Sequence, residues 1–104
     1  MASVDTLWSD FRTFEEYWVE LRPYLLRYLP NDRQTDKADR LFNAAKRYLW
    51  WAIRADKKRQ RLVALWWCML ALARIREHNR LAEALGERGL QAQEEAKSRR
   101  KATA

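Results

Sequence analysis

Apolar residues recur along the first thirty positions of the chain with alternating spacings of four and three. The positions are Leu7, Phe11, Phe14, Trp18, Leu21, Leu25 and Tyr28. This spacing places them on one face of an amphipathic helix. Asp5 suits the N-cap, and Thr13 with Glu16 also matches a capping box. The pattern continues in register past Pro23, so we expect a kink near residues 19–23 and no break.

A polar loop, LPNDRQTD over residues 29–36, separates this helix from the next. Pro30 stops the first helix, and Thr35 or Asp36 is expected to cap the second. Apolar residues then return at helical spacing to about Ala55, and they are Ala38, Leu41, Phe42, Ala45, Tyr48, Leu49 and Ala52.

No glycine or proline interrupts residues 36–78, which form either one long helix or two helices joined by a tight turn. A single helix of about 43 residues would span about 65 Å and leave much of its apolar surface uncovered. We therefore favour a turn at residues 55–58 with Asp56 as the next N-cap, and a third helix from about Lys57 to His78. Asn79 is then the candidate cap of a fourth helix.

That fourth helix, over about residues 80–97, is weak because Gly86 and Gly89 each cost about 1 kcal/mol relative to alanine. The whole chain has 104 residues, is 48% hydrophobic and contains only 2 Gly and 2 Pro, which favours helices in one domain. We expect an all-α protein, a small antiparallel four-helix bundle that forms oligomers. Residues 1–97 are its single domain, and residues 98–104 are a basic flexible tail.

The tryptophans are expected to differ in orientation. Unwrapped at 100° per residue, the second helix turns Leu41 inward and Trp50 to the opposite side, among basic residues. Trp50 is then either a platform that stacks a base or docks a partner, or a ring covered by its arginine neighbours. A hairpin would bring Trp51 level with Trp66 and Trp50 level with Trp67.

On the third helix, Trp66 is expected in the core, on an inward face with Leu62, Val63, Met69, Leu70 and Ala73. The opposite side is also apolar, but small, and carries no charge. It consists of Ala64, Cys68, Ala71 and Ile75. This helix is therefore expected to be covered on both faces, and the small face is the expected oligomer interface, with the fourth helix as the alternative cover.

The chain carries a formal net charge of +7, and residues 31–61 hold ten basic and four acidic side chains. A basic surface attracts phosphate, although charges near a helix turn are also common on a merely solvated surface. The candidate residues for binding nucleic acid or a partner are Arg40, Lys46, Arg47, Trp50, Arg54, Lys57, Lys58, Arg59 and Arg61.

Residues suited to catalysis or metal binding are scarce. His78 is the only histidine and Cys68 the only cysteine, so no catalytic residue, metal ligand or cofactor is assigned. A lone cysteine fits a reducing compartment, and the apolar run Leu62–Ala73 is too short to cross a bilayer. We expect a cytoplasmic protein that is neither an enzyme nor bound to a membrane.

Four segments in order, YLLRYLP, ADRLFNAAKRYL, RADKK and LALARIREH, resemble a known family over roughly residues 14–90. It is the four-helix-bundle family of the accessory variability determinant proteins of diversity-generating retroelements, which is related to the ribosomal RNA intervening-sequence proteins. The resemblance implies a basic homopentamer without catalysis, which binds a reverse transcriptase and its template RNA.

Three hypotheses follow. The first is a non-catalytic accessory protein that self-assembles and binds nucleic acid, RNA rather than DNA, together with a reverse transcriptase. The second is a small helical subunit of an RNA-guided effector complex that contacts an RNA backbone. The third is a purely protein-binding helical adaptor whose charge keeps it soluble.

Overall fold

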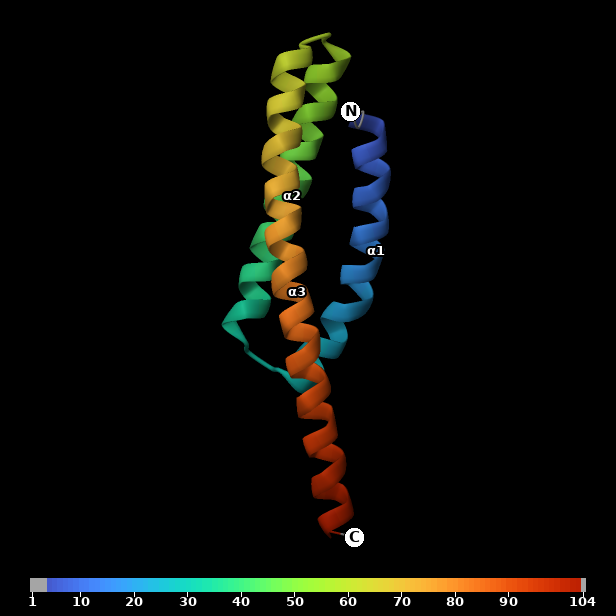
Figure 1. The fold of residues 1–104 in the computed structure, drawn as a ribbon, viewed down its shortest axis with the longest axis vertical. Coiled ribbons are helices and arrows are strands. Elements are labelled where there is room, and N and C mark those ends of the chain that lie inside the picture. Colours follow the sequence, from blue (N-terminus) through green and yellow to red (C-terminus); the bar gives the residue numbers. More distant parts are fainter. Residues whose placement is uncertain (1–3, 104) are drawn as a thin grey trace.

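The structure, a computed structural model, describes residues 4–103, and these form three α-helices. They are α1 (Val4–Tyr28), α2 (Arg33–Lys57) and α3 (Arg61–Thr103). α2 and α3 form a long hairpin, and α1 packs along it while the end of α3 projects beyond both (Figure 1). The molecule measures 65 × 21 × 17 Å, and its radius of gyration of 17.5 Å exceeds the ~13 Å of a compact chain of this length. The all-helical prediction is confirmed for these residues.

α1 confirms the predicted apolar pattern. Phe11, Trp18 and Leu25, each seven residues after the last, are all buried. Pro23 lies inside the helix without ending it, and α1 changes direction in its C-terminal part (Figure 1). The helix continues because the proline removes only one backbone donor while the buried residues on either side stay in register.

α2 begins earlier than predicted. Its N-cap is Asp32, whose side chain accepts a hydrogen bond of 2.8 Å from the backbone N–H of Gln34. The expectation of Thr35 or Asp36 at this position was wrong, because Asp32 has the same capping chemistry and comes first along the loop. Thr35 is buried in the first turn instead.

The predicted hairpin turn is confirmed, but it lies slightly later in the chain. α2 continues through Lys57, and the turn occupies residues 58–60, with Arg59 in the left-handed region at φ 60°. Asp56 is not an N-cap. It lies in the last turn of α2, where its carbonyl accepts a hydrogen bond of 2.9 Å from the N–H of Arg59.

The expected separate fourth helix, over residues 80–97, is the second half of α3. Asn79 caps nothing, because no proline or turn sequence stops the helix there and its buried positions continue in register on both sides. Ile75, His78, Ala82 and Leu85 are all buried. The segment expected as a flexible tail, residues 98–104, continues α3 as far as Thr103, and residue 104 lies outside the described residues.

Small residues allow α2 and α3 to lie close together. The buried alanines of α2 are Ala38, Ala45, Ala52 and Ala55, and those of α3 are Ala64, Ala71 and Ala82. Larger side chains fill the space toward α1 in two clusters, one around Phe11 and Leu49 and the other around Trp18, Leu25 and Leu85. Phe42 packs against both clusters and joins them into one core.

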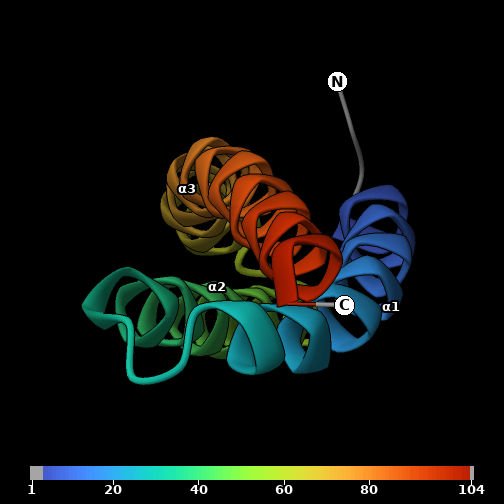
Figure 2. The ribbon, with the colours of Figure 1, turned by 90° about the horizontal axis from the view of Figure 1, so that it is seen from below.

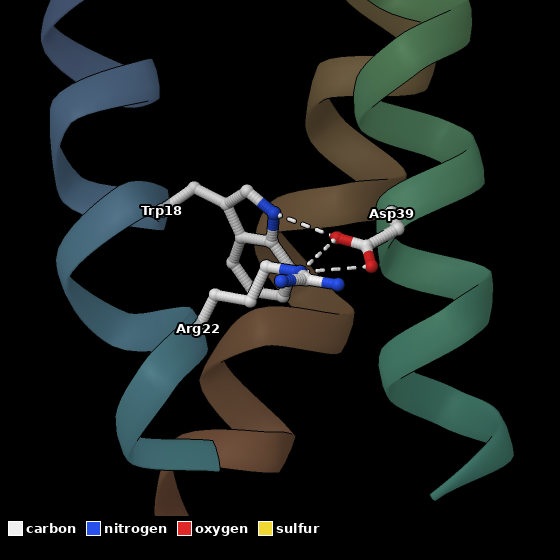
Figure 3. A network of polar contacts seen from close by, with 3 residues as sticks. All are labelled: Trp18, Arg22 and Asp39. Carbon is white, nitrogen blue, oxygen red and sulfur yellow. Dashed lines mark hydrogen bonds and ion pairs between the residues drawn. The ribbon is translucent and has the colours of Figure 1, made fainter. Parts of the chain in front are cut away.

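One polar network ties α1 to α2 beside this core (Figure 3). The indole Nε1 of Trp18 donates to Oδ1 of Asp39 at 3.1 Å, and Nε of Arg22 donates to both carboxylate oxygens at 3.0 and 2.9 Å. Two donors of α1, the neutral indole and the charged guanidinium, thus bind the same carboxylate of α2. This network joins α1 to α2 at the level of Asp39.

The predicted orientation of α3 was reversed. Trp66 is 56% exposed, Leu62 is 83% exposed and Met69 is 62% exposed, so the large face is not the core. The small face packs inside the chain, where Ala64, Ala71 and Ile75 are buried and Cys68 is half-buried. The reason is steric, because small side chains let the helix axes approach where bulky ones would hold them apart. These four residues are therefore not an exposed oligomer interface.

Across the described residues, none of the three helices combines the length and apolarity needed to cross a lipid bilayer.

Candidate nucleic-acid or partner interface

Three arginines of α2, Arg40, Arg47 and Arg54, are spaced seven residues apart and are all exposed. Seven residues are close to two helical turns, so the three side chains leave the helix in nearly the same direction at intervals of about 10 Å. We call them the arginine stripe. Among the residues that the structure describes, none of the three forms an ion pair. Their guanidinium groups are therefore available to an external anion.

Trp50 lies beside this stripe, and the prediction that it faces away from the core is confirmed. Its side chain is 51% exposed, and the guanidinium carbon of Arg54 lies 4.7 Å from its ring centroid. Arg54 therefore covers part of the ring, as the second alternative expects, and half of the ring remains accessible, so stacking of a base or docking of a partner stays a prediction. An aromatic surface joined to a free cation suits a stacked base with its phosphate.

A groove of about 490 Å³ lies between α1 and α2 next to Trp50. It is lined by Trp8, Asn43, Lys46, Arg47 and Trp50. Lys46 also forms an ion pair of 3.1 Å with Glu15 of α1, so one of the two cations that line the groove already has a partner. The sequence prediction missed Trp8, although its position directly after Leu7 places it beside the buried face of α1.

The remaining candidates gather at the end of the hairpin. Lys57, Lys58, Arg59 and Arg61 are all exposed around the turn. Beside them lies a pocket of about 330 Å³, lined by Trp51, Arg54, Ala55, Lys58, Gln60, Val63 and Trp67. The turn thus brings the basic cluster next to an aromatic surface, and Arg54 connects this pocket with Trp50.

The aromatic pairing across the hairpin differs by one residue from the prediction. Trp51 packs on Trp67 with ring centroids 4.8 Å apart, and Tyr48 stacks on the same ring at 5.6 Å. Trp66 lies against Trp67 at 5.0 Å but faces solvent. The predicted partners were Trp51 with Trp66, because the turn was placed too early in the chain.

His78 is a core residue in the middle of α3 and not a residue at a helix end. Its ring is fully buried and meets Phe14 and Trp18 edge-on at 4.6 and 4.5 Å. Neither ring nitrogen has a hydrogen-bond partner within the described part of the chain. Burial lowers the pKa of His78 to about 4, against a smaller opposing effect of the Asp39 carboxylate. The histidine is therefore neutral at pH 7.

Cys68 is half-buried, and burial raises the pKa of its thiol, with a further contribution from the nearby Asp56 carboxylate. A raised pKa keeps the sulfur protonated and weakly nucleophilic. Within residues 4–103, no group of three or more histidine, cysteine, aspartate or glutamate side chains is arranged to hold a metal ion.

Comparisons of the chain with protein-family models, with curated proteins and with solved structures give no match. The function is therefore inferred from the surface of α2 and the end of the hairpin.

Proposed function

We propose that this chain is a non-catalytic, basic accessory protein that binds nucleic acid, RNA rather than DNA, through α2. The arginine stripe contacts separate phosphates along the strand, and Trp50 stacks an unpaired base. The cations at the hairpin end extend the contact past the turn. In this proposal the chain self-assembles and acts together with a polymerase partner, a reverse transcriptase, as the family resemblance implies. Its location is the cytoplasm, which the lone cysteine favours.

The observation that carries this proposal is the combination of the arginine stripe with Trp50. Free guanidinium groups at regular intervals favour a polyanion over a single small anion, because each interval offers a separate phosphate contact. A phosphate contact does not involve the base. The exposed indole face adds a base contact, since stacking contributes about 1–3 kcal/mol per base. Single strands present both groups at once, which is why RNA with unpaired bases is preferred.

A salt titration of RNA binding tests the proposal. The probe is a fluorescein-labelled single-stranded RNA of mixed sequence, followed by fluorescence anisotropy. The variant Arg40→Gln, Arg47→Gln, Arg54→Gln removes three phosphate contacts. We expect affinity to fall at least tenfold, and the slope of log K against log salt to shrink by about 2, at about 0.7 per contact for single strands.

The matched control is Arg12→Gln, Arg33→Gln, Arg80→Gln, which removes the same charge from exposed positions on all three helices. It is expected to weaken binding only slightly and to leave the slope nearly unchanged. Equal losses from the two triple variants would show that net charge alone attracts the RNA, and the stripe would then have no special role.

The same purified chain also serves to test self-assembly and to distinguish the proposed function from the two alternatives. Light scattering of the isolated chain measures its molar mass, and a monomer at all concentrations would contradict self-assembly. Both RNA-binding functions predict that the isolated chain binds RNA, so its molar mass separates them: a chain that binds RNA as a monomer would favour a backbone-binding subunit of an RNA-guided complex. Failure to bind RNA at low salt would leave the protein-binding adaptor.

A further inference from the structure

The outward face of α3 carries a row of exposed apolar side chains, most of them large. Leu62, Trp66, Met69 and Ala73 follow one another at spacings of four, three and four, and Leu65 lies beside them. Leu62 is 83%, Met69 62% and Trp66 56% exposed. We call these five residues the outer stripe. Figure 2 shows that α3 lies to one side of both other helices, which leaves its far side open.

The outer stripe lies outside the core, because α3 meets the core through its small opposite face; within the stripe only Trp66 is described in a ring contact, with Trp67 at 5.0 Å. An exposed apolar surface that is continuous over about three helical turns marks an interaction site more often than scattered single residues do. Its spacing of four and three is that of a coiled-coil seam, which matches the side of a second helix. The stripe spans about 16 Å from Leu62 to Ala73 at 1.5 Å per residue.

Basic residues stand at both ends of the stripe. Arg59 and Arg61 precede it, and Arg76 and Arg80 continue its line on α3; all four are exposed. In the part of the chain that the structure describes, none of these four forms an ion pair. The nearest carboxylate on α3, that of Glu77, already faces Arg74 at 3.8 Å and Lys37 at 4.0 Å.

This charge pattern distinguishes three possible partners of the stripe, which are a second copy of the chain, a membrane and a helix of another protein. A second copy of the chain would bring basic ends against basic ends whether the two α3 helices ran parallel or antiparallel, and like charges facing each other are destabilising. A membrane surface would accept basic ends but gives no reason for a seam with spacings of four and three. A helix with carboxylates at both ends satisfies the seam and the charges together.

We infer that the outer stripe is the docking site for an amphipathic helix of a partner protein, with an apolar seam of three turns and acidic residues at both ends. Trp66 is the central anchor, because its large indole is 56% exposed near the middle of the stripe. Arg61 and Arg76 pair with the acidic ends and fix the register. This site lies on α3; it shares Arg61 with the proposed RNA contact at the hairpin end but does not use the arginine stripe of α2.

Two synthetic peptides test the inference on the full-length chain. Both are fluorescein-labelled, helix-forming peptides with leucine at the same seam positions, one flanked by glutamates and the other by lysines. The glutamate-flanked peptide is expected to bind with a Kd at least tenfold below that of the lysine-flanked peptide. The variant Trp66→Glu, Met69→Glu should abolish its binding, while RNA binding by α2 stays within twofold.

The matched control is Val19→Glu, Leu90→Glu, which places two new carboxylates at apolar positions that are 62% and 56% exposed on α1 and α3. It should leave peptide binding unchanged, and circular dichroism checks that both double variants remain helical. Equal binding of the two peptides, or of neither, would overturn the inference.

Two further measurements are able to overturn it. Sedimentation of the chain with phosphatidylserine-containing vesicles, lost in Trp66→Glu, Met69→Glu, would assign the stripe to a membrane. A dimer in light scattering that the same variant converts to a monomer would assign it to a second copy. Under the inference, the wild-type chain does not sediment through the stripe and its molar mass is the same as that of the variant.

Discussion

The two faces of α3 differ in side-chain size and in exposure. In most amphipathic helices the larger apolar side chains face the core, whereas in α3 they face solvent. The inner face is composed mainly of small or polarisable residues, and it is buried. Its residues are Ala64, Ala71, Ile75, His78, Ala82, Leu85 and Gly89. The outer face carries larger apolar side chains, and they are exposed. Side-chain size therefore sets how closely a neighbouring helix approaches, and the exposed larger face is the surface on which we propose that a partner helix docks.

Leucine truncation on each face gives the largest expected contrast. Leu85 is 1% exposed in the core and Leu62 is 83% exposed on the outer stripe. We expect Leu85→Ala to lower the free energy of unfolding by about 2–5 kcal/mol, through lost burial and the cavity left behind. Leu62→Ala should change it by less than about 0.5 kcal/mol. Urea unfolding followed by circular dichroism measures both.

The contrast is sharp because the two variants make the same chemical change in one helix. Similar losses of stability would mean that the outer stripe is covered in solution, for example by another copy of the chain. The midpoint would then also depend on protein concentration, which separates this result from an error in the packing of α3.

His78 gives the inner face a pH dependence that the outer face lacks. Its pKa is about 4 in the folded chain and 6.5 in the unfolded chain, so between these values the unfolded state binds more protons. Stability is therefore fully present above about pH 6.5 and is lost as the pH falls toward 4. The loss amounts to up to about 3 kcal/mol at 1.36 kcal/mol per unit.

The variant His78→Met isolates this effect, because it fills similar volume without a titratable group. Its unfolding free energy should change little between pH 6.5 and 4.5, whereas that of the wild type falls. Asp32 does not interfere with this measurement. Its hydrogen bond to Arg88 lowers the pKa of its carboxyl, so its contribution to stability is lost only at a pH below the usual range of aspartate pKa values. A wild-type profile parallel to that of His78→Met would contradict a buried neutral histidine.

The sequence was sufficient for much of the fold and for the orientation of Trp50. The spacing of Phe11, Trp18 and Leu25 identified the buried face of α1, and the tight turn after α2 followed from the length of the apolar run. Trp50 was placed correctly because its helix has charges on only one side. Helical periodicity is informative where one face is polar.

The same reasoning failed on α3, where both faces are apolar and periodicity cannot say which is inside. The choice of the larger face assumed that burial follows side-chain volume, whereas the alanines of α2 already required small partners opposite them. The end of α3 was also misplaced, because Asn79 resembles a cap in isolation and only the register of Ala82 and Leu85 shows that the helix continues. Trp8 was missed because its groove requires two helices.

Enlarging one alanine on each face gives a smaller contrast. Ala71 is fully buried between the helices, and Ala73 is exposed on the outer stripe. We expect Ala71→Leu to destabilise the chain by about 1–3 kcal/mol, because the closely packed helices have no room for the side chain. Ala73→Leu should be neutral in unfolding experiments and should tighten binding of the glutamate-flanked peptide. Equal stability of the two variants would contradict close packing of α2 and α3.

The two glycines of α3 give the smallest contrast, and they separate helix propensity from packing. A Cβ at Gly86 would meet nothing within 4 Å, whereas one at Gly89 would lie 2.9 Å from Cε1 of the Tyr24 ring. Gly86→Ala should therefore raise the unfolding free energy by up to about 1 kcal/mol, the propensity gain alone.

Gly89→Ala has the same propensity gain but must displace the Tyr24 ring, whose hydroxyl is held by a hydrogen bond of 2.8 Å with Oε1 of Gln93. We therefore expect Gly89→Ala to be less stable than Gly86→Ala by about 1 kcal/mol or more, the scale of overpacking in a filled site. Thermal unfolding of the two variants measures the difference. If Tyr24→Ala restores the gain at residue 89, the tyrosine ring sets the limit. If the two glycines respond alike, α1 does not pack on α3 at this level, and the inner face ends before residue 89.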